Sequence, residues 1–514
     1  MVNLGSSMMH GFNLNKRISA AVVFIIAIGL SVAGCGGQAA QEAINTTEAP
    51  APVMASATPK ADDTETPIPT ATVTPEPTAT PAPPEWPAAG IEVKSETDIR
   101  LAAELGTTWI RRNALQWHKI EPVPGERKWE EAAWLDAELK LISEAGMEAV
   151  LIVRGAPDWA LRIAGPTCGA IKSEAMGDFA AFLKEAVVRY KDAPYNVKYW
   201  ELGNEPDVDP SLTSLTSPFG CWGDIADSNY YGGAYYAEML KVAYPAIKAT
   251  DPEAQVLVGG LLMDCDPVKP PETSPGSGQL RYCTPSRYLE GILANGGGDY
   301  FDGVSFHAYD YYNGAEGQYG NGNWYSAWNT TGPVMAAKAG YLRALLSSFG
   351  YSDKFLMNTE NALLCGRDGT EAECQAEAFQ KTKDYYVVQA STMAVAEGLR
   401  SNVWYDLRGW RGSGLIDKAR QPLPAFQAYQ FNIKMLAGMG YWGKVEGTPG
   451  IMGYEFRQGA RVVWVIWAVD GEAHPLEIPG ELSKVYDGYG SVLESGSAVN
   501  VTIAPMYVEW MVGE

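Results

Sequence analysis

The sequence of 514 residues predicts an α/β fold, a (β/α)8 TIM barrel followed by a small C-terminal β-sandwich. Short apolar runs alternate with helical patterns from Gly90 to about residue 438, which indicates parallel strands joined by helices. Eight such strand–helix units follow one another, the number that closes a barrel. After about Gly440 the helical pattern stops, and short strand-like runs are separated by Gly, Pro and Asp.

The eight barrel strands are expected, in order, at Gly90–Val93, Thr107–Arg111, Ala149–Val153, Val197–Glu201, Gln255–Gly260, Phe301–Phe306, Lys354–Asn358 and Asn402–Tyr405. The helices that follow them are expected to end at Leu105 and then to lie near 134–145, 179–190, 235–247, 288–294, 335–348, 376–397 and 424–438. Strands of the sandwich are expected at Ile451–Phe456, Arg461–Ala468, Leu476–Ile478 and Val499–Ile503.

The first residues are typical of an export signal. Lys16 and Arg17 precede the apolar run Ile18–Val32, which is too short for a comfortable membrane span. The run ends in Val-Ala-Gly before Cys35, which is similar to a bacterial lipoprotein signal whose cysteine becomes lipidated. We therefore expect an exported protein, lipid-anchored to the bacterial cell envelope and facing outside the cytoplasm. An ordinary signal peptide with an unrelated thiol is the alternative.

The expected organisation has four parts: 1–34, a lipoprotein signal peptide; 35–84, the lipidated Cys35 and a Thr/Pro-rich linker; 85–439, the barrel; and 440–514, the β-sandwich domain. The linker has almost no large apolar side chains to bury, and its proline content favours an extended spacer.

Charge and motifs exclude several classes of function. The chain carries 39 Lys and Arg against 61 Asp and Glu, a net charge of −22, which argues against a nucleic-acid partner and against any membrane contact other than the lipid anchor. It contains four His and neither a G-x-S-x-G nor a G-x-x-x-x-G-K-[ST] motif. We therefore expect no metal and no organic cofactor. Composition is silent on the oligomeric state.

Apart from Cys35, the chain has an even number of cysteines, as expected for disulfides in an exported protein. They are Cys168, Cys221, Cys265, Cys283, Cys365 and Cys374. Six cysteines allow 15 pairings. Proximity in the sequence favours 265 with 283 and 365 with 374, which leaves 168 with 221.

Two glutamates stand where a barrel enzyme carries its reactive groups, at the carboxyl ends of strands. Strand four runs into Gly203-Asn204-Glu205-Pro206, and strand seven runs into Asn358-Thr359-Glu360. A facing pair of carboxylates is the requirement for glycoside hydrolysis, in which one donates a proton and the other attacks the anomeric carbon. Like-charge proximity raises the pKa of one member and keeps it protonated near neutral pH.

Further motifs lie at other strand ends. They are Trp109-Ile110-Arg111-Arg112 with Trp117 and Ile120–Gly125, Ala156–Ala160, Trp200–Pro206, and Asp302–Tyr309. Together with Glu360, these motifs resemble the retaining glycoside hydrolases of clan A over most of residues 90–430. Within the clan the resemblance is nearest to the β-xylosidase/α-L-iduronidase type, which often carries a β-sandwich.

The resemblance implies roles for individual side chains. Glu205 is expected to be the acid/base and Glu360 the nucleophile. Asn204 is expected to bind the sugar 2-hydroxyl, Tyr309 to orient the nucleophile, and His307 to line the same subsite.

Two further substrate-binding residues are implied with less precise positions. Trp404, at the end of strand eight, is expected to form the floor beneath the sugar. The resemblance also implies a substrate-binding arginine in strand two. The spacing from the preceding Gly106 favours Arg111, whereas the spacing to Trp117 favours Arg112; we prefer Arg111.

The function expected is a retaining glycoside hydrolase that cleaves O-glycosidic bonds of a poly- or oligosaccharide. A non-catalytic carbohydrate-binding surface protein and a transglycosylase are the alternatives. The long segment 310–332 supplies aromatic rings that could form a platform for a sugar chain: Tyr311, Tyr312, Tyr319, Trp324, Tyr325 and Trp328. The sugar, the linkage, and endo or exo action do not follow from these patterns.

Overall fold

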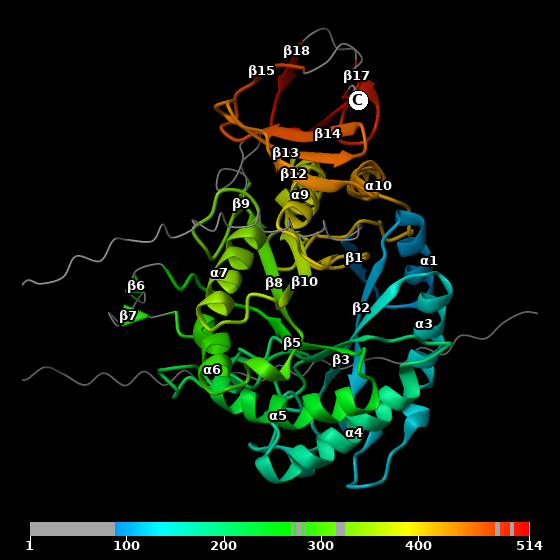
Figure 1. Ribbon diagram of the computed structural model, residues 1–514, viewed down its shortest axis with the longest axis vertical. Coiled ribbons are helices and arrows are strands. Elements are labelled where there is room, and N and C mark those ends of the chain that lie inside the picture. The colour runs from blue at the N-terminus through cyan, green and yellow to red at the C-terminus, as the bar shows by residue number, and fades with distance from the viewer. Residues whose placement is uncertain are drawn as a thin grey trace, which may run out of the picture. The chain divides into compact units, whose positions relative to one another are not determined.

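The computed structural model describes residues 88–268, 272–273, 280–281, 283–314, 324–478, 484–493 and 498–512 (Figure 1). The expected signal peptide, the lipidation site Cys35 and the linker up to residue 84 lie outside these ranges.

Eight parallel strands form the closed barrel. They are β1 (Ala89–Glu92), β2 (Trp109–Gln116), β3 (Glu148–Arg154), β4 (Tyr199–Asn204), β5 (Gln255–Leu261), β8 (Gly303–Tyr312), β10 (Phe355–Leu364) and β11 (Asn402–Trp404). The strand order is β10-β11-β1-β2-β3-β4-β5-β8, and pairing of β8 with β10 closes the ring. The predicted (β/α)8 barrel is therefore confirmed.

The long helices lie outside this ring, in alternation with the strands (Figure 1). They are α1 (Glu96–Leu105), α3 (Ala133–Glu144), α4 (Met176–Tyr190), α5 (Gly233–Thr250), α6 (Tyr288–Ala294), α7 (Val334–Ser348), α9 (Glu377–Ala396) and α10 (Pro424–Leu436). Local chemistry sets their ends. In α1, the Ser95 side chain accepts from the N–H of Asp98, and Gly106 ends the helix in the left-handed conformation at φ 89°.

Short elements fill the connections between these strands and helices. They are α2 (Trp117–Ile120), α8 (Ala372–Gln375), β6 (Glu272–Thr273), β7 (Leu280–Arg281) and β9 (Trp324–Tyr325).

Strand β10 is longer than the predicted Lys354–Asn358, and it contains an irregularity that matters for the site. Asn358 lies opposite Phe306 of β8, whereas Glu360 lies opposite His307, so one extra residue is inserted between them. A bulge of this kind re-aims the side chains that follow it. It places the Glu360 carboxylate beside His307.

The C-terminal segment forms antiparallel sheets, as predicted for a β-sandwich. One sheet has the order β12 (Gly440–Lys444), β13 (Ile451–Gln458), β14 (Arg461–Ala468), β19 (Met506–Met511), β16 (Lys484–Tyr486) and β17 (Val492–Leu493). A second sheet pairs β15 (His474–Glu477) with β18 (Ala498–Val501). The strands expected at 476–478 and 499–503 thus belong to the second sheet, and β12, β16, β17 and β19 were not predicted.

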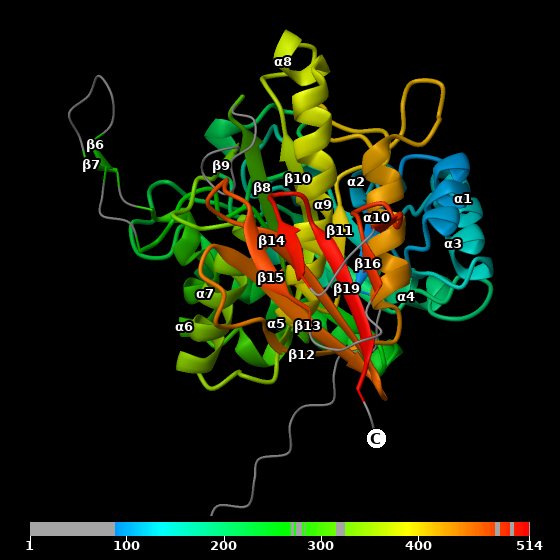
Figure 2. The ribbon, with the colours of Figure 1, turned by 90° about the horizontal axis from the view of Figure 1, so that it is seen from above.

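The sandwich packs on the barrel through α9 and α10, and Figure 2 draws its strands over these two helices. The Asn432 amide of α10 donates to Tyr507 Oη at 3.0 Å, and the Phe431 ring lies 5.0 Å from the Tyr507 ring. Trp467 and Tyr507 belong to the same hydrophobic cluster as the barrel helices. The barrel and the sandwich therefore share one continuous core.

In the part of the chain that the structure describes, no helix is both long enough and apolar enough to cross a bilayer.

Candidate active site

A single buried arginine joins four barrel strands. The Arg111 guanidinium of β2 donates to Glu92 of β1 at 2.9 Å, and to Glu201 and Asn204 of β4 at 2.6 Å each. It also donates to Glu360 of β10. The Arg111 side chain is fully buried, so these acceptors replace the water that a guanidinium otherwise requires.

Arg112, the other candidate in the sequence, lies on the opposite face of β2. Its Nε donates to Glu138 of α3 at 2.7 Å, and its guanidinium lies over the Trp134 ring at 5.3 Å. Successive residues of a strand point to opposite faces. The barrel interior therefore receives Arg111, as preferred from the sequence, and the helix layer receives Arg112.

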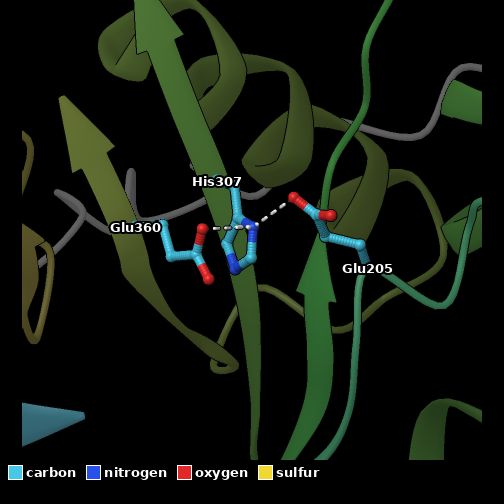
Figure 3. Close-up of side chains that lie close together, drawn as sticks. All are labelled: Glu205, His307 and Glu360. Carbon is cyan, nitrogen blue, oxygen red and sulfur yellow. Dashed lines mark hydrogen bonds and ion pairs between the residues drawn. The ribbon is translucent and has the colours of Figure 1, made fainter. Parts of the chain in front are cut away.

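The two predicted catalytic carboxylates face each other across His307 (Figure 3). His307 Nδ1 lies 2.9 Å from Glu205 Oε1 and 3.4 Å from Glu360 Oε2. One oxygen from each glutamate and one nitrogen of the imidazole all lie within 4.8 Å of one another. Tyr309 Oη donates to Glu360 Oε2.

Backbone conformation sets the direction of Glu205. Gly203 and Glu205 have positive φ angles of 95° and 51°, so the chain turns sharply after β4. The N–H of Glu205 donates to the carbonyl of Gly260 at 2.8 Å, which ties this turn to β5. A Cβ atom at Gly260 would lie 2.1 Å from His307 Nε2, so only glycine leaves room for the imidazole there.

Burial raises the pKa of both carboxyls, but their partners differ. At Glu205, burial and the negative charge of Glu360 raise the pKa well above its usual range. At Glu360, burial also raises the pKa, while the Arg111 cation and the hydrogen bonds from Tyr309 and Arg111 oppose the rise. The surroundings thus favour a proton on Glu205 and negative charge on Glu360.

The neighbours of the pair titrate far from their usual ranges. Burial, Arg111 and Lys338 hold the pKa of His307 well below 6.5, so its imidazole is neutral. Burial and the Glu360 charge hold the pKa of Tyr309 well above 10, so its hydroxyl remains a donor. Burial raises the pKa of Glu92 to about 8, although Arg111 opposes it.

Glu205, His307 and Glu360 are also the group of side chains, within the described ranges, whose spacing could offer three ligand atoms to a metal. The guanidinium of Arg111 donates to Glu360 and lies 3.3 Å from His307 Nε2. A fixed cation in contact with two of the three groups disfavours a second cation between them.

Trp404 is not brought to these residues, which corrects the expected sugar floor. Its indole is 2% exposed, donates to the carbonyl of Ser413 at 2.9 Å and contacts Tyr386 of α9, on the helix side of β11. The next residue, Tyr405, points the other way, and its ring centroid lies 6.1 Å from that of Tyr309. Because neighbouring residues of a strand point to opposite faces, a prediction that is displaced by one residue selects a side chain on the wrong face.

Trp410 was missed from the sequence. Its ring lies 6.0 Å from Tyr309 and 6.2 Å from Tyr405, and 47% of the residue is exposed. It stands in the loop after β11, where Gly, Arg and Trp give no strand or helix pattern that would fix its direction.

The aromatic segment 310–332 divides into two groups. Tyr311 and Tyr325 stack at 5.3 Å and line a cavity of about 530 Å³ together with Arg411. Trp324 and Trp328 are 1% and 3% exposed and therefore pack the loop against the barrel. Tyr312 is 8% exposed but also reaches the cavity. Tyr319 lies outside the described residues.

Three disulfides lie at this end of the barrel: one joins the loops after β3 and β4, and the other two each close a single connection, after β5 and after β10. The pairs are Cys168–Cys221, Cys265–Cys283 and Cys365–Cys374, as sequence proximity favoured. Disulfides of this number are typical of exported proteins.

Sequence reasoning missed Glu92 and Glu201, the two other carboxylates on Arg111. Each stands in an otherwise apolar strand, and a charged residue is almost never fully buried without a partner. Glu92, Arg111 and Glu201 lie in the predicted strands β1, β2 and β4, and their charges were the available sign that these side chains pair with one another.

Comparison with known proteins shows that part of the sequence, and the fold, are similar to those of glycoside hydrolases. The model of glycoside hydrolase family 42, described as β-galactosidase, matches residues 80–163. The β-galactosidase BgaH of Haloferax lucentense is 42% identical over 66 residues, which are 12% of this chain and 10% of that protein. The chain thus aligns with about a tenth of the length of this relative.

Solved structures match over most of the chain. A family 39 glycoside hydrolase from Bacteroides cellulosilyticus WH2 has a TM-score of 0.60 at 18% identity, covering 82% of this chain and 80% of that one. A β-xylosidase from Caulobacter crescentus has a TM-score of 0.52 at 14% identity, covering 83% and 97%. The xylanase Xyn30A from Clostridium acetobutylicum has a TM-score of 0.52 at 13% identity, covering 83% and 96%. The chain therefore resembles clan A glycoside hydrolases, and its fold is theirs.

Proposed function

We propose that this protein is a retaining glycoside hydrolase in which Glu360 is the nucleophile and Glu205 the general acid/base. The observation that carries the proposal is the buried carboxylate pair, with one oxygen of each residue within 4.8 Å of the other. Retaining enzymes hold their two carboxyl groups about 5–5.5 Å apart, whereas inverting enzymes need about 6.5–9.5 Å to admit a water.

The different neighbours of the two carboxylates support the division of roles. Glu360 accepts hydrogen bonds from Arg111 and Tyr309, which favour its ionised form and orient it for attack. Glu205 lies beside the neutral His307 and has a strongly raised pKa, which suits a proton donor at neutral pH.

The reaction then proceeds in two displacements. Glu360 attacks the anomeric carbon while Glu205 gives its proton to the departing glycosidic oxygen, so a covalent glycosyl-enzyme forms and the leaving group departs as an alcohol. Glu205, now ionised, removes a proton from a water that attacks the same carbon. The sugar is released with its original configuration, and both carboxyl groups return to their starting states.

The substrate proposed is a poly- or oligosaccharide. The rings of Trp410, Tyr405 and Tyr309 form an aromatic group beside the carboxylates. Tyr311, which follows Tyr309 in β8, lines a cavity together with Tyr325. The relatives include a β-galactosidase, a β-xylosidase and a xylanase, so β-galactosides and β-xylosides are the first substrates to try.

Substitution of the two glutamates tests the proposal on aryl glycosides. Glu360→Ala should lower kcat by about 10⁴-fold or more, and added azide should restore a product of inverted configuration, because the small anion replaces the missing nucleophile. Glu205→Ala should spare only substrates with good leaving groups, such as dinitrophenyl glycosides, and azide should then yield a product of retained configuration.

Glu138→Gln is the matched control, since Glu138 is an equally buried carboxylate whose arginine partner is Arg112 on the outer face. Full activity in both glutamate variants would overturn the site assignment. Sugar binding without turnover by the wild type would favour a binding protein, and products lengthened by an added acceptor would favour a transglycosylase.

A further inference from the structure

A buried lysine contacts the backbone of His307, the residue that lies between the two carboxylates (Figure 3). Lys338 of α7 is 5% exposed, and its ammonium donates to the carbonyl of Leu262 after β5 and to the carbonyl of His307 in β8, each at 2.7 Å. Its Nζ also lies 5.9 Å from the centre of the Trp328 ring. The side chain thus joins the loop after β5 to the middle of the neighbouring strand β8.

Each of these two strands, β5 and β8, contacts Glu205. The His307 imidazole lies 2.9 Å from Glu205, and Gly260 of β5 accepts the hydrogen bond from the Glu205 N–H. Asp207 braces the same loop after β5, accepting from the N–H groups of Leu262 and Met263 at 2.9 and 2.8 Å. Contacts that hold the loop after β5 and the strand β8 in place therefore also hold Glu205 in place.

The carboxyl groups that act on the ammonium come from the segments after β4 and β5 and from β8. They are Glu205 and Asp207 after β4, Asp264 after β5, and Asp310 of β8. Burial lowers the pKa of Lys338 to about 8, while these carboxylates oppose the fall. Near pH 7 Lys338 therefore carries a positive charge, and Arg111 and Lys338 both act against the rise in the pKa of Glu205 that burial, Glu360 and Asp207 produce.

We propose that Lys338 is a positioning residue for the proton donor, which ties the loop after β5 to His307 of β8 and adds to Arg111 a second positive charge that keeps the proton of Glu205 transferable. The inference rests on the proposed function, because it assigns Glu205 the role of general acid. An acid whose pKa is too high releases its proton too weakly to help a poor leaving group. Lys338 acts on the reaction only through Glu205 and His307.

The chain offers a matched control in Lys383 of α9. This lysine is 1% exposed, donates to the carbonyls of Gly414 and Gly412 at 2.7 and 3.1 Å, and has its pKa lowered to about 8 by burial. Its partners lie in the loop after β11. Lys338→Met and Lys383→Met therefore share the cost of removing a buried ammonium, but the first alone removes the charge that faces Glu205.

The test is the pH dependence of kcat/KM on a phenyl and a 2,4-dinitrophenyl glycoside of whichever sugar the wild type cleaves. In Lys338→Met the descending limb, where Glu205 loses its proton, should move up by about one pH unit, as expected for one charge at an effective dielectric constant of about 20. Activity on the phenyl glycoside should fall about tenfold more than on the dinitrophenyl glycoside, which needs no acid. Lys383→Met should leave both the descending limb of the pH profile and the ratio of the activities on the two glycosides at wild-type values.

The proposal would be overturned by a folded Lys338→Met protein whose descending limb and ratio of activities on the two glycosides equal those of the wild type. If that variant does not fold, Lys338→Arg decides, because it retains the charge: its limb should stay at the wild-type position, and a shift of a unit would be contrary to the proposal.

A second measurement needs no turnover. The ¹³C-carboxyl resonance of Glu205, assigned with Glu205→Gln, should titrate about one unit higher in Lys338→Met. A wild-type protein with no glycosidase activity would therefore refute the proposed function, whereas an unmoved titration would refute the role of Lys338.

Discussion

At the scale of single residues, the site depends on the unequal sharing of one cation. Arg111 contacts Glu92, Glu201 and Glu360, so one positive charge faces three carboxyl groups. Because the pKa of Glu92 is raised to about 8, Glu92 is protonated at neutral pH and leaves the guanidinium to the other two. The three carboxyls are therefore not equivalent, although each is within hydrogen-bonding distance of the same side chain.

Glu92→Gln and Glu201→Gln test this difference. An amide replaces a neutral carboxyl at Glu92, so kcat/KM near pH 6–7 should remain within about threefold of the wild type. The two proteins should diverge above about pH 8, where only the wild type gains the negative charge. Glu201→Gln removes one carboxylate oxygen from a fully buried pair with Arg111 and should cost about 3 kcal/mol of unfolding free energy. Kinetics from pH 6 to 9 and thermal melting measure both effects, and equal losses in the two variants would contradict the assignment.

The sequence offered a rule for placing Glu205 and Glu360, but none for the direction of the side chains of a short strand. Glu205 and Glu360 follow apolar runs and could be placed by the rule that reactive groups stand at the carboxyl ends. Trp404 was misplaced because the face of a short strand changes with every residue, and Tyr405 points to the interior instead. The charges of Glu92 and Glu201 in apolar strands indicated that each needs a buried partner, but not that both share Arg111, which is 19 and 90 residues away in sequence.

At the scale of elements, the eight barrel strands were predictable because buried parallel strands are continuous apolar runs. The bulge in β10 was not, since it depends on how β10 pairs with β8. The strands β12 and β16 of the sandwich were missed because they are short and partly exposed, so their residues show no clear alternation.

The loop after β11 gives a prediction about binding. Trp410 is half exposed, its ring stands nearly perpendicular to those of Tyr309 and Tyr405, and the Arg411 guanidinium lies over it at 5.5 Å, so its exposed part can meet a sugar ring. Trp410→Ala should raise KM about tenfold, or about 1.4 kcal/mol of binding, with kcat changed by less than about twofold.

Trp442 of β12 is the matched control for that measurement. It is 65% exposed and lies beneath the Arg457 guanidinium at 4.0 Å, much as Trp410 lies beneath Arg411 at 5.5 Å. Trp442→Ala should leave KM unchanged on a short oligosaccharide. An unchanged KM in Trp410→Ala would remove Trp410 from the binding site.

At the scale of the whole molecule, the sandwich and the barrel are parts of one packed body. The sequence indicated two domains because the periodicity changes near Gly440, but periodicity reports elements and not the contacts between them. Phe431 of α10 packs against Tyr486 and Tyr507 of the sandwich, and Tyr489 donates to Asp384 of α9 at 2.8 Å. These contacts make independent unfolding of either part unfavourable.

Calorimetry should therefore show a single unfolding transition, with the calorimetric and van't Hoff enthalpies nearly equal. Phe431→Ala should destabilise that transition by about 2 kcal/mol without splitting it. Phe349→Ala, at a 38% exposed position after α7, is the control and should have little effect. Two separate transitions in the wild type would contradict a shared core.

The reach of Arg111 across the barrel also orders the events of biosynthesis. Its acceptor Glu360 is synthesised 249 residues later, and His307 196 residues later, so the guanidinium has its full set of acceptors only when the seventh strand has joined the ring. A nascent or truncated chain that stops before β10 lacks Glu360 and leaves Arg111 without one of its carboxyl partners. The full set of contacts of Arg111 is thus completed only late in barrel assembly, and an N-terminal fragment that ends before β10 cannot form it.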